Sequence, residues 1–155
     1  MEPRIDPDPK NADVIRNLRN NLMHMTSLER QALAKVLPLK QVQVKKPPTS
    51  GLIMAQVRDS FKTDFFLGEV LVTQVQVIYD GHTAQVTLLG NCPEAALIAA
   101  MLQVLSDAGA NDAVAAAGRA AAPAVDRISA RQHSESAIAA ATRVRFETMA
   151  EEEPL

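Results

Sequence analysis

Residues 70–89, VLVTQVQVIYDGHTAQVTLL, decide the fold of this chain, because two alternating segments flank a short turn. Asp80-Gly81 is typical of a two-residue hairpin turn, which needs two residues with positive φ. This turn places Tyr79 opposite His82 and sets the pairing of the residues behind them.

The two faces of the predicted hairpin differ in polarity. One face carries the mostly apolar pairs Val77–Ala84, Val75–Val86 and Thr73–Leu88. The other face carries the polar pairs Gln76–Gln85 and Gln74–Thr87. Turn chemistry and alternation independently indicate the same register, so we predict an antiparallel hairpin with one face on a core.

Further segments favour strands on either side of this hairpin. Residues 41–45 alternate Gln and Val, a turn is predicted at 47–51, and residues 52–58 resume as a strand before a polar connection at 59–64. Residues 143–149 alternate again. We therefore predict an α+β fold with an antiparallel sheet of four to five strands around the hairpin, and helices on one face.

The amino-terminal region predicts two helices. Apolar residues recur at helical spacing from residue 12 to residue 25. Thr26 and Glu29 then match a capping box, which predicts the start of a second helix that ends at Pro38.

Two more helices are predicted after the hairpin. Pro93 suits the first position of a helix and Gly109 suits its end. In the alanine-rich segment that follows, Pro123 acts as a divider, so we predict a helix over 124–141.

The helix predicted at 93–108 is apolar nearly all round, because Gln103 is the only polar residue between 95 and 105. A surface helix normally shows a single apolar stripe. We therefore expect this helix to be buried from two sides, and we expect a second polypeptide to cover the surface that its own domain leaves bare.

The chain divides into a flexible tail at 1–10, one α+β domain at 11–150 and an acidic tail at 151–155. Its 155 residues and 47% hydrophobic content suit a single globular domain with a core.

Several features predict a soluble cytoplasmic protein. Cys92 is the only cysteine, which fits a reducing compartment. Residues 1–11 are polar and hold three prolines, so no secretory leader is expected. The apolar stretch 95–105 is too short to span a bilayer, and no membrane partner is expected.

Positive charge is concentrated near the amino terminus, with eight basic and two acidic residues in 10–46. Two interpretations remain open: a solvated helix face, or a surface that meets phosphates, RNA or an acidic partner. No aromatic residues alternate with these cations, so we expect no nucleic-acid partner.

No residue pattern establishes an enzyme by itself. A Walker-type phosphate loop is absent, and the three histidines are far apart, so no metal site is predicted. Asp64 and Glu69 flank a predicted strand entrance at Gly68, and their spacing is not diagnostic of an acid–base pair. Cys92 is interpreted as a capping or core residue, with a catalytic thiol as the alternative.

Residues 65–73, FFLGEVLVT, resemble the Phe-x-x-Gly-Glu-x-x-x-Thr pattern of the PhnG family, which supplies a subunit of bacterial carbon–phosphorus lyase. The similarity covers roughly residues 12–150. Further matches occur in the same order at Gly51-Leu52-Ile53-Met54, Gly90, residues 95–105 and residues 141–149.

This resemblance implies a hetero-oligomer with PhnH, PhnI and PhnJ, in which two copies of the chain are one option. It also implies a role in the step, assigned to PhnG, PhnH, PhnI and PhnL, at which a phosphonate displaces adenine from MgATP. The product is a ribose 1-phosphonate 5-triphosphate, and PhnJ later performs the radical cleavage. The complex uses MgATP, and no cofactor is expected on this chain.

The resemblance also names the residues that we expect to face a substrate or a partner: Gly68, Glu69, Thr73 and Arg143. Some polar positions depart from the family pattern. Gln74 stands where an Arg is common, and Asn91-Cys92 stands where the family has Arg-Asp. The loss of these cations favours a scaffolding role, or a divergent member with altered partners, over direct participation in the chemistry. We expect the chain not to be catalytic alone.

Two alternatives belong to other functional classes. One is a homo-oligomeric binding or regulatory module without enzymatic activity, which would associate through the apolar helix at 93–108. The other is a free-standing small enzyme that uses Cys92 or Glu69.

Overall fold

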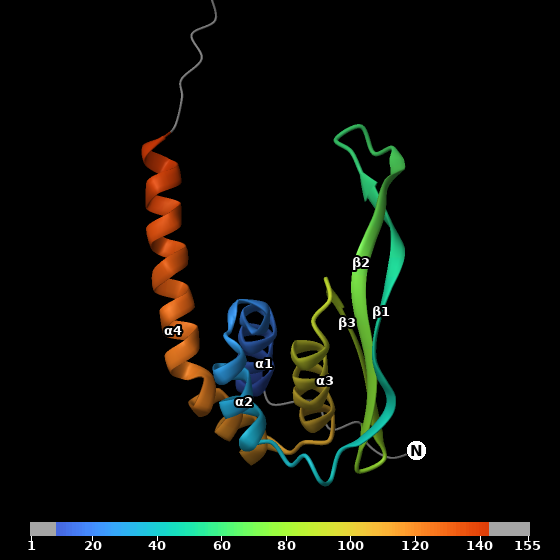
Figure 1. Ribbon diagram of the computed structural model, residues 1–155, viewed down its shortest axis with the longest axis vertical. Coiled ribbons are helices and arrows are strands. Elements are labelled where there is room, and N and C mark those ends of the chain that lie inside the picture. The colour runs from blue at the N-terminus through green and yellow to red at the C-terminus, as the bar shows by residue number, and fades with distance from the viewer. Residues whose placement is uncertain (1–8, 143–155) are drawn as a thin grey trace, which may run out of the picture.

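The computed structural model describes residues 9–142, which fold as a three-stranded antiparallel sheet with helices on one face (Figure 1). The strand order is β1-β2-β3. The elements are α1 (Pro9–Asn21), the 3₁₀ helix η1 (Leu22–His24), α2 (Ser27–Lys35), β1 (Gln43–Arg58), β2 (Asp64–Tyr79), β3 (His82–Leu89), α3 (Pro93–Asp107) and α4 (Asn111–Ala141).

The predicted hairpin is confirmed pair by pair. Asp80 and Gly81 form its turn with φ of 46° and 76°. Tyr79 pairs with His82, and the pairing continues in register to Val72 and Leu89. The apolar face is buried at Val75, Val77, Ala84 and Val86, whereas the glutamines of the opposite face are exposed or half-buried.

The α+β class is confirmed, but the described residues hold three strands where four to five were predicted. The turn predicted at 47–51 is wrong: β1 runs through it as one strand of 16 residues, with register shifts around Lys46. The prolines at 47 and 48 are tolerated because β1 is an edge strand, where a missing N–H need not break a ladder bond. The strand predicted at 143–149 lies outside the described residues.

Helix α3 lies at the centre of the molecule (Figure 1). It contacts all three strands on one side and α1, α2 and α4 on the other. Its buried residues span nearly its whole length: Ala95, Ala96, Ile98, Ala99, Ala100, Met101, Leu102, Val104, Leu105 and Ser106.

Burial of this helix from two sides is therefore confirmed, but the expectation that a second polypeptide covers it is wrong. The helices of the same chain supply the outer layer, and no apolar side chain of α3 from residue 95 to 105 remains exposed. The same observation argues against the alternative of self-association through α3, because the helix has no exposed apolar side chain between 95 and 105 for a second copy to contact.

Helix α4 is continuous through Pro123, contrary to the predicted division there. An interior proline costs about 3 kcal/mol because it removes a hydrogen bond and crowds the preceding turn. Burial of Ala121, Ala124 and Ile128 on both sides of the proline offsets this cost. Figure 1 shows α4 bending in its lower part, as expected for a helix that contains proline.

The predicted capping box is present and also ties α2 to α4. Glu29 accepts a hydrogen bond from the Thr26 backbone N–H at 2.7 Å, and Thr26 Oγ1 accepts one from the Glu29 N–H. The Arg127 guanidinium donates to both oxygens of Glu29 at 3.0 and 2.9 Å. These bonds, with Arg127 the largest contributor, lower the pKa of Glu29 to about 2.

We predict that Arg127→Gln destabilises the fold in a pH-dependent way. The pKa of Glu29 is lower in the folded chain, so its bonds contribute stability that is fully present above the unfolded pKa of about 4.5. That stability is lost as the pH falls through about 2. The difference in Tm between wild type and variant, measured by circular dichroism, should shrink between pH 5 and pH 2.

Arg131→Gln is the matched control, because the Arg131–Glu135 pair lies within α4 and joins no second element. A difference in Tm for Arg127→Gln that is equally large at pH 2 and pH 7 would contradict this account.

Candidate functional site

A group of polar residues joins the sheet to the start of α3. We call Ser50, Thr73, Gly90, Asn91 and Cys92 the polar junction. Thr73 is fully buried, and its Oγ1 donates to the Gly90 carbonyl at 2.7 Å and accepts from the Cys92 N–H at 3.0 Å.

The edge strand β1 also reaches the polar junction. Ser50 Oγ lies 3.1 Å from Thr73 Oγ1 and donates to Asn91 Oδ1 at 2.9 Å. Gly90 adopts a φ of 86°, which favours glycine, and its N–H donates to the Leu71 carbonyl at 2.7 Å. The polar junction thereby couples β1, β2 and the N terminus of α3.

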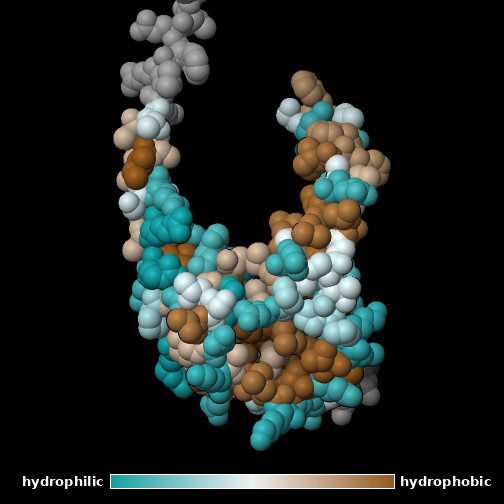
Figure 2. All heavy atoms as spheres, in the orientation of Figure 1, coloured by the Kyte–Doolittle hydropathy of each residue, from teal (hydrophilic) through white to brown (hydrophobic). Residues whose placement is uncertain are grey.

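Beyond the polar junction, β1 and β2 continue without β3 or α3 beside them (Figure 1). We call residues 52–71 the β arm. Figure 2 shows hydrophobic side chains gathered over it. Its exposed large apolar residues are Leu52, Ile53, Met54, Phe61, Phe65, Phe66, Leu67 and Leu71.

The predicted site residues are spread between the β arm and the polar junction. Gly68 lies on the β arm at a register shift, with a φ of 139°, and Leu67 is left without a partner in the pairing. Glu69 pairs with Met54 and lies on the same face as Thr73, about 13 Å along the strand. Arg143 lies outside the described residues. Their contact with a substrate or partner stays a prediction.

Asp64 and Glu69 do not form a close pair in the structure. Asp64 accepts two hydrogen bonds from Arg58, at 2.6 and 2.8 Å, and these lower the pKa of Asp64. The Glu69 side chain has no hydrogen bond or ion pair among residues 9–142.

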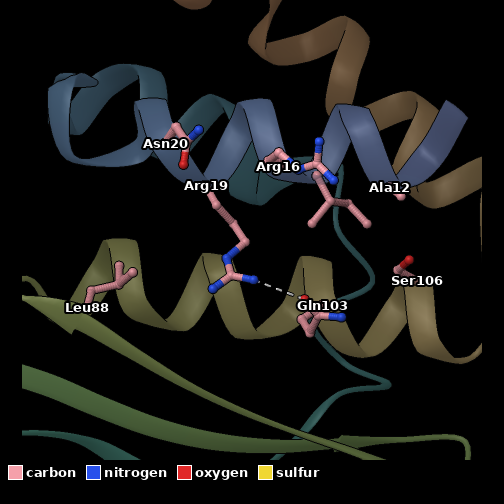
Figure 3. A pocket seen from close by; sticks show the side chains of 8 residues that line it. Ala12, Arg16, Arg19, Asn20, Leu88, Gln103 and Ser106 are labelled. Atoms are coloured by element: carbon pink, nitrogen blue, oxygen red, sulfur yellow. Dashed lines mark hydrogen bonds between the residues drawn. The ribbon is translucent and has the colours of Figure 1, made fainter. Parts of the chain in front are cut away.

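A pocket of about 440 Å³ lies between α1 and α3 (Figure 3). Arg16 and Arg19 line it from α1, and Gln103 and Ser106 line it from α3. Arg19 donates to Gln103 Oε1 at 3.2 Å, and Gln103 in turn donates to Asp107 at 2.8 Å.

Chemically, this pocket offers guanidinium donors to a carboxylate or a phosphate. The excess of positive charge in 10–46 indicated such a surface, although it did not indicate where the surface lies. The sequence signal for the α3 wall was Gln103, the only polar residue between 95 and 105, because a half-buried polar side chain in an apolar segment needs a partner.

The Cys92 thiol is half-buried and donates to the Leu89 carbonyl, with sulfur and oxygen 3.4 Å apart. Cys92 occupies the N-cap position of α3, but its side chain makes no capping bond. Residues 9–142 contain no group of three or more His, Cys, Asp or Glu side chains placed to hold a metal ion. No helix among them is long and apolar enough to cross a membrane.

The family model of the phosphonate metabolism protein PhnG matches residues 16–151, which is most of the chain. The chain belongs to the PhnG family. This family provides a subunit of the carbon–phosphorus lyase complex, which acts in phosphonate metabolism. No curated protein matches the chain.

The residues that carry the PhnG pattern follow β2 from the β arm to the polar junction. Phe65 and Gly68 lie on the β arm, and Thr73 lies in the polar junction. In this PhnG-family chain the Thr73 hydroxyl is engaged by the backbone on both sides of Asn91. Thr73 therefore has a structural role whatever else it contacts.

We predict that Thr73→Val lowers the free energy of unfolding by about 1–3 kcal/mol, because the Gly90 carbonyl and the Cys92 N–H lose a buried partner. Urea denaturation measures this change. Thr87→Val is the matched control on the exposed face of β3 and should stay within about 0.5 kcal/mol of wild type. Equal effects of the two substitutions would contradict the role given to the polar junction.

Proposed function

We propose that this chain is an accessory subunit of the carbon–phosphorus lyase core and acts at the step where a phosphonate displaces adenine from MgATP. The product of that step is a ribose 1-phosphonate 5-triphosphate. In this proposal the chain holds PhnI-, PhnH- and PhnJ-like subunits together in the cytoplasm and is not catalytic alone.

The match to the PhnG family over residues 16–151 carries this proposal. A second support is the kind of surface that the chain exposes. Contiguous apolar surface on a protein marks a site that another molecule covers, and the β arm carries eight exposed large apolar residues. Gly68 and Glu69 lie within this surface, so in the proposal they face a partner.

The pocket between α1 and α3 supports a second kind of contact. Arg16 and Arg19 suit an acidic side chain of a partner subunit or a phosphate of the substrate. In the proposal this pocket is a docking point on the helical side of the molecule, away from the apolar β arm.

The proposal predicts that adenine release requires this chain. An assembly of the partner subunits purified with the chain should release adenine from MgATP and methylphosphonate, and the same subunits without it should fall to background. Chromatography measures adenine, and phosphorus NMR identifies the phosphonate ester.

Growth with a phosphonate as the sole phosphorus source is the cellular version of this test, with growth on phosphate as its control. A chain that never co-purifies with the other subunits, or adenine release that does not depend on it, would contradict the proposal.

Cys92→Ala should leave adenine release unchanged, since in this proposal the thiol has no catalytic role. If the Cys92→Ala variant keeps its fold but no longer releases adenine, the result would favour the alternative of a free-standing enzyme that uses Cys92.

A further inference from the structure

The pocket between α1 and α3 has the size and the lining of a small-molecule site. Its volume of about 440 Å³ lies within the range of about 300–1,000 Å³ that is usual for such sites. Ile15 and Leu88 supply apolar surface, and Arg16 and Arg19 supply two guanidinium groups. None of the described residues that line the pocket carries a carboxylate.

Ser106 lines this pocket with a hydroxyl group that the fold itself does not use. The residue is only 5% exposed, and its side chain makes no hydrogen bond among residues 9–142. Figure 3 shows its hydroxyl on the side of α3 that faces α1. Burial of a polar group without a partner is unfavourable, so most such groups are paired. The pocket is where a bound molecule can supply the missing partner.

Arg19 brings a positive charge into the same pocket. Its guanidinium extends from α1 toward α3, where it donates to Gln103 Oε1 at 3.2 Å (Figure 3). That bond uses one of the five N–H groups of a guanidinium. Arg19 is half-buried and has no ion pair within the described part of the chain. An anion in the pocket would therefore meet a charge that no carboxylate compensates.

Arg16 is the second guanidinium and lies one turn before Arg19 on α1, so both belong to the same helix face. Arg16 pairs with Asp13 at 3.4 Å, and both side chains are about three-quarters exposed. An exposed pair of this kind contributes little stability, so Arg16 can turn to a ligand in the pocket at a small cost.

We propose that this pocket binds a small organic anion whose head group is a phosphate ester or a phosphonate. The two guanidinium groups and the Ser106 hydroxyl donate to the oxygens of the head group, and the carbon group lies against Ile15 and Leu88. A tetrahedral head group fits these donors better than a planar carboxylate, because they come from helices on opposite sides of the pocket. The inference rests on the proposed function for the docking point and assigns one occupant to it.

Nuclear magnetic resonance of the nitrogen-15-labelled full chain, titrated with phenylphosphonate, tests this inference. The side-chain amides of Asn20 and Gln103 line the pocket, and they should shift with a dissociation constant of about 1 mM or below. The side-chain amide of Gln85, on the exposed face of the sheet, should not move. Absence of a saturable shift at Asn20 and Gln103 would overturn the inference.

Two substitutions test the donors. Arg19→Gln should raise the dissociation constant about tenfold, because it removes a charge-assisted hydrogen bond. Arg131→Gln is the matched control, since it removes the same charge from α4, outside the pocket, and should change the constant less than about twofold. Equal effects of these two substitutions would contradict a built site.

Ser106→Ala separates binding from stability. Because the hydroxyl has no partner within the chain, its removal should leave Tm unchanged or higher while it raises the dissociation constant about threefold or more. Unchanged binding by Ser106→Ala would overturn the role of the hydroxyl as a ligand donor.

Three further compounds test the ligand class. Benzoate lacks the tetrahedral head group and inorganic phosphate lacks the carbon group, so each should bind about tenfold more weakly than phenylphosphonate. Equal binding of either compound would overturn the stated class. Phenyl phosphate separates the two sources, because tighter binding than phenylphosphonate points to a phosphate ester and weaker binding to a phosphonate.

The inference and the proposed function fail separately, because binding is measured on the chain alone and adenine release on the assembly. Adenine release that requires a chain unable to bind phenylphosphonate would end the inference and keep the proposed function. Binding by a chain on which adenine release does not depend would end the proposed function and keep the site.

Discussion

The burial of α3 is the constraint on which the rest of the structure depends. A helix that is apolar nearly all round must be covered on every side, because it has no polar face that could be exposed to water. The sheet covers one side, and α1, α2 and α4 cover the other. Alanines at 95, 96, 99 and 100 allow these layers to approach α3 closely.

The length of α3 then limits how far the core extends. Its 15 residues span about 22 Å, whereas the 16 residues of β2 span about 53 Å and the 31 residues of α4 about 46 Å. Both longer elements must therefore overhang the core. The β arm and the exposed half of α4, residues 130–141, are the parts of these two elements that extend beyond the core. The polar junction lies where the part of the sheet covered by α3 ends and the β arm begins.

This geometry suits a protein that works through its surfaces. The best-connected polar residues, Thr73 and Glu29, hold elements of the chain together. The surfaces that remain for other molecules lie outside the core. They are the exposed apolar residues of the β arm and the pocket between α1 and α3, where Arg16 pairs with Asp13 and Arg19 donates to Gln103. Membership of the PhnG family agrees with this division, because a subunit of a complex needs surfaces that other chains recognise.

The amino-acid sequence by itself determined the elements whose signals are local. The Asp80-Gly81 turn and the alternation around it specified the central hairpin to the residue, and the Thr26–Glu29 capping box specified the start of α2. The residues at 65–73 also indicated the family. These features depend on neighbours within a few positions, so one strand or one turn contains the whole signal.

Only the tertiary structure decided which surfaces are covered. The sequence showed that the segment at 93–108 needs cover, but the cover comes from α1, α2 and α4, which are distant in the chain. It likewise showed apolar residues at 52–54 and 65–67 without showing that α3 ends too early to reach them. Burial depends on the relative lengths and positions of packed elements, and no local pattern records that relation.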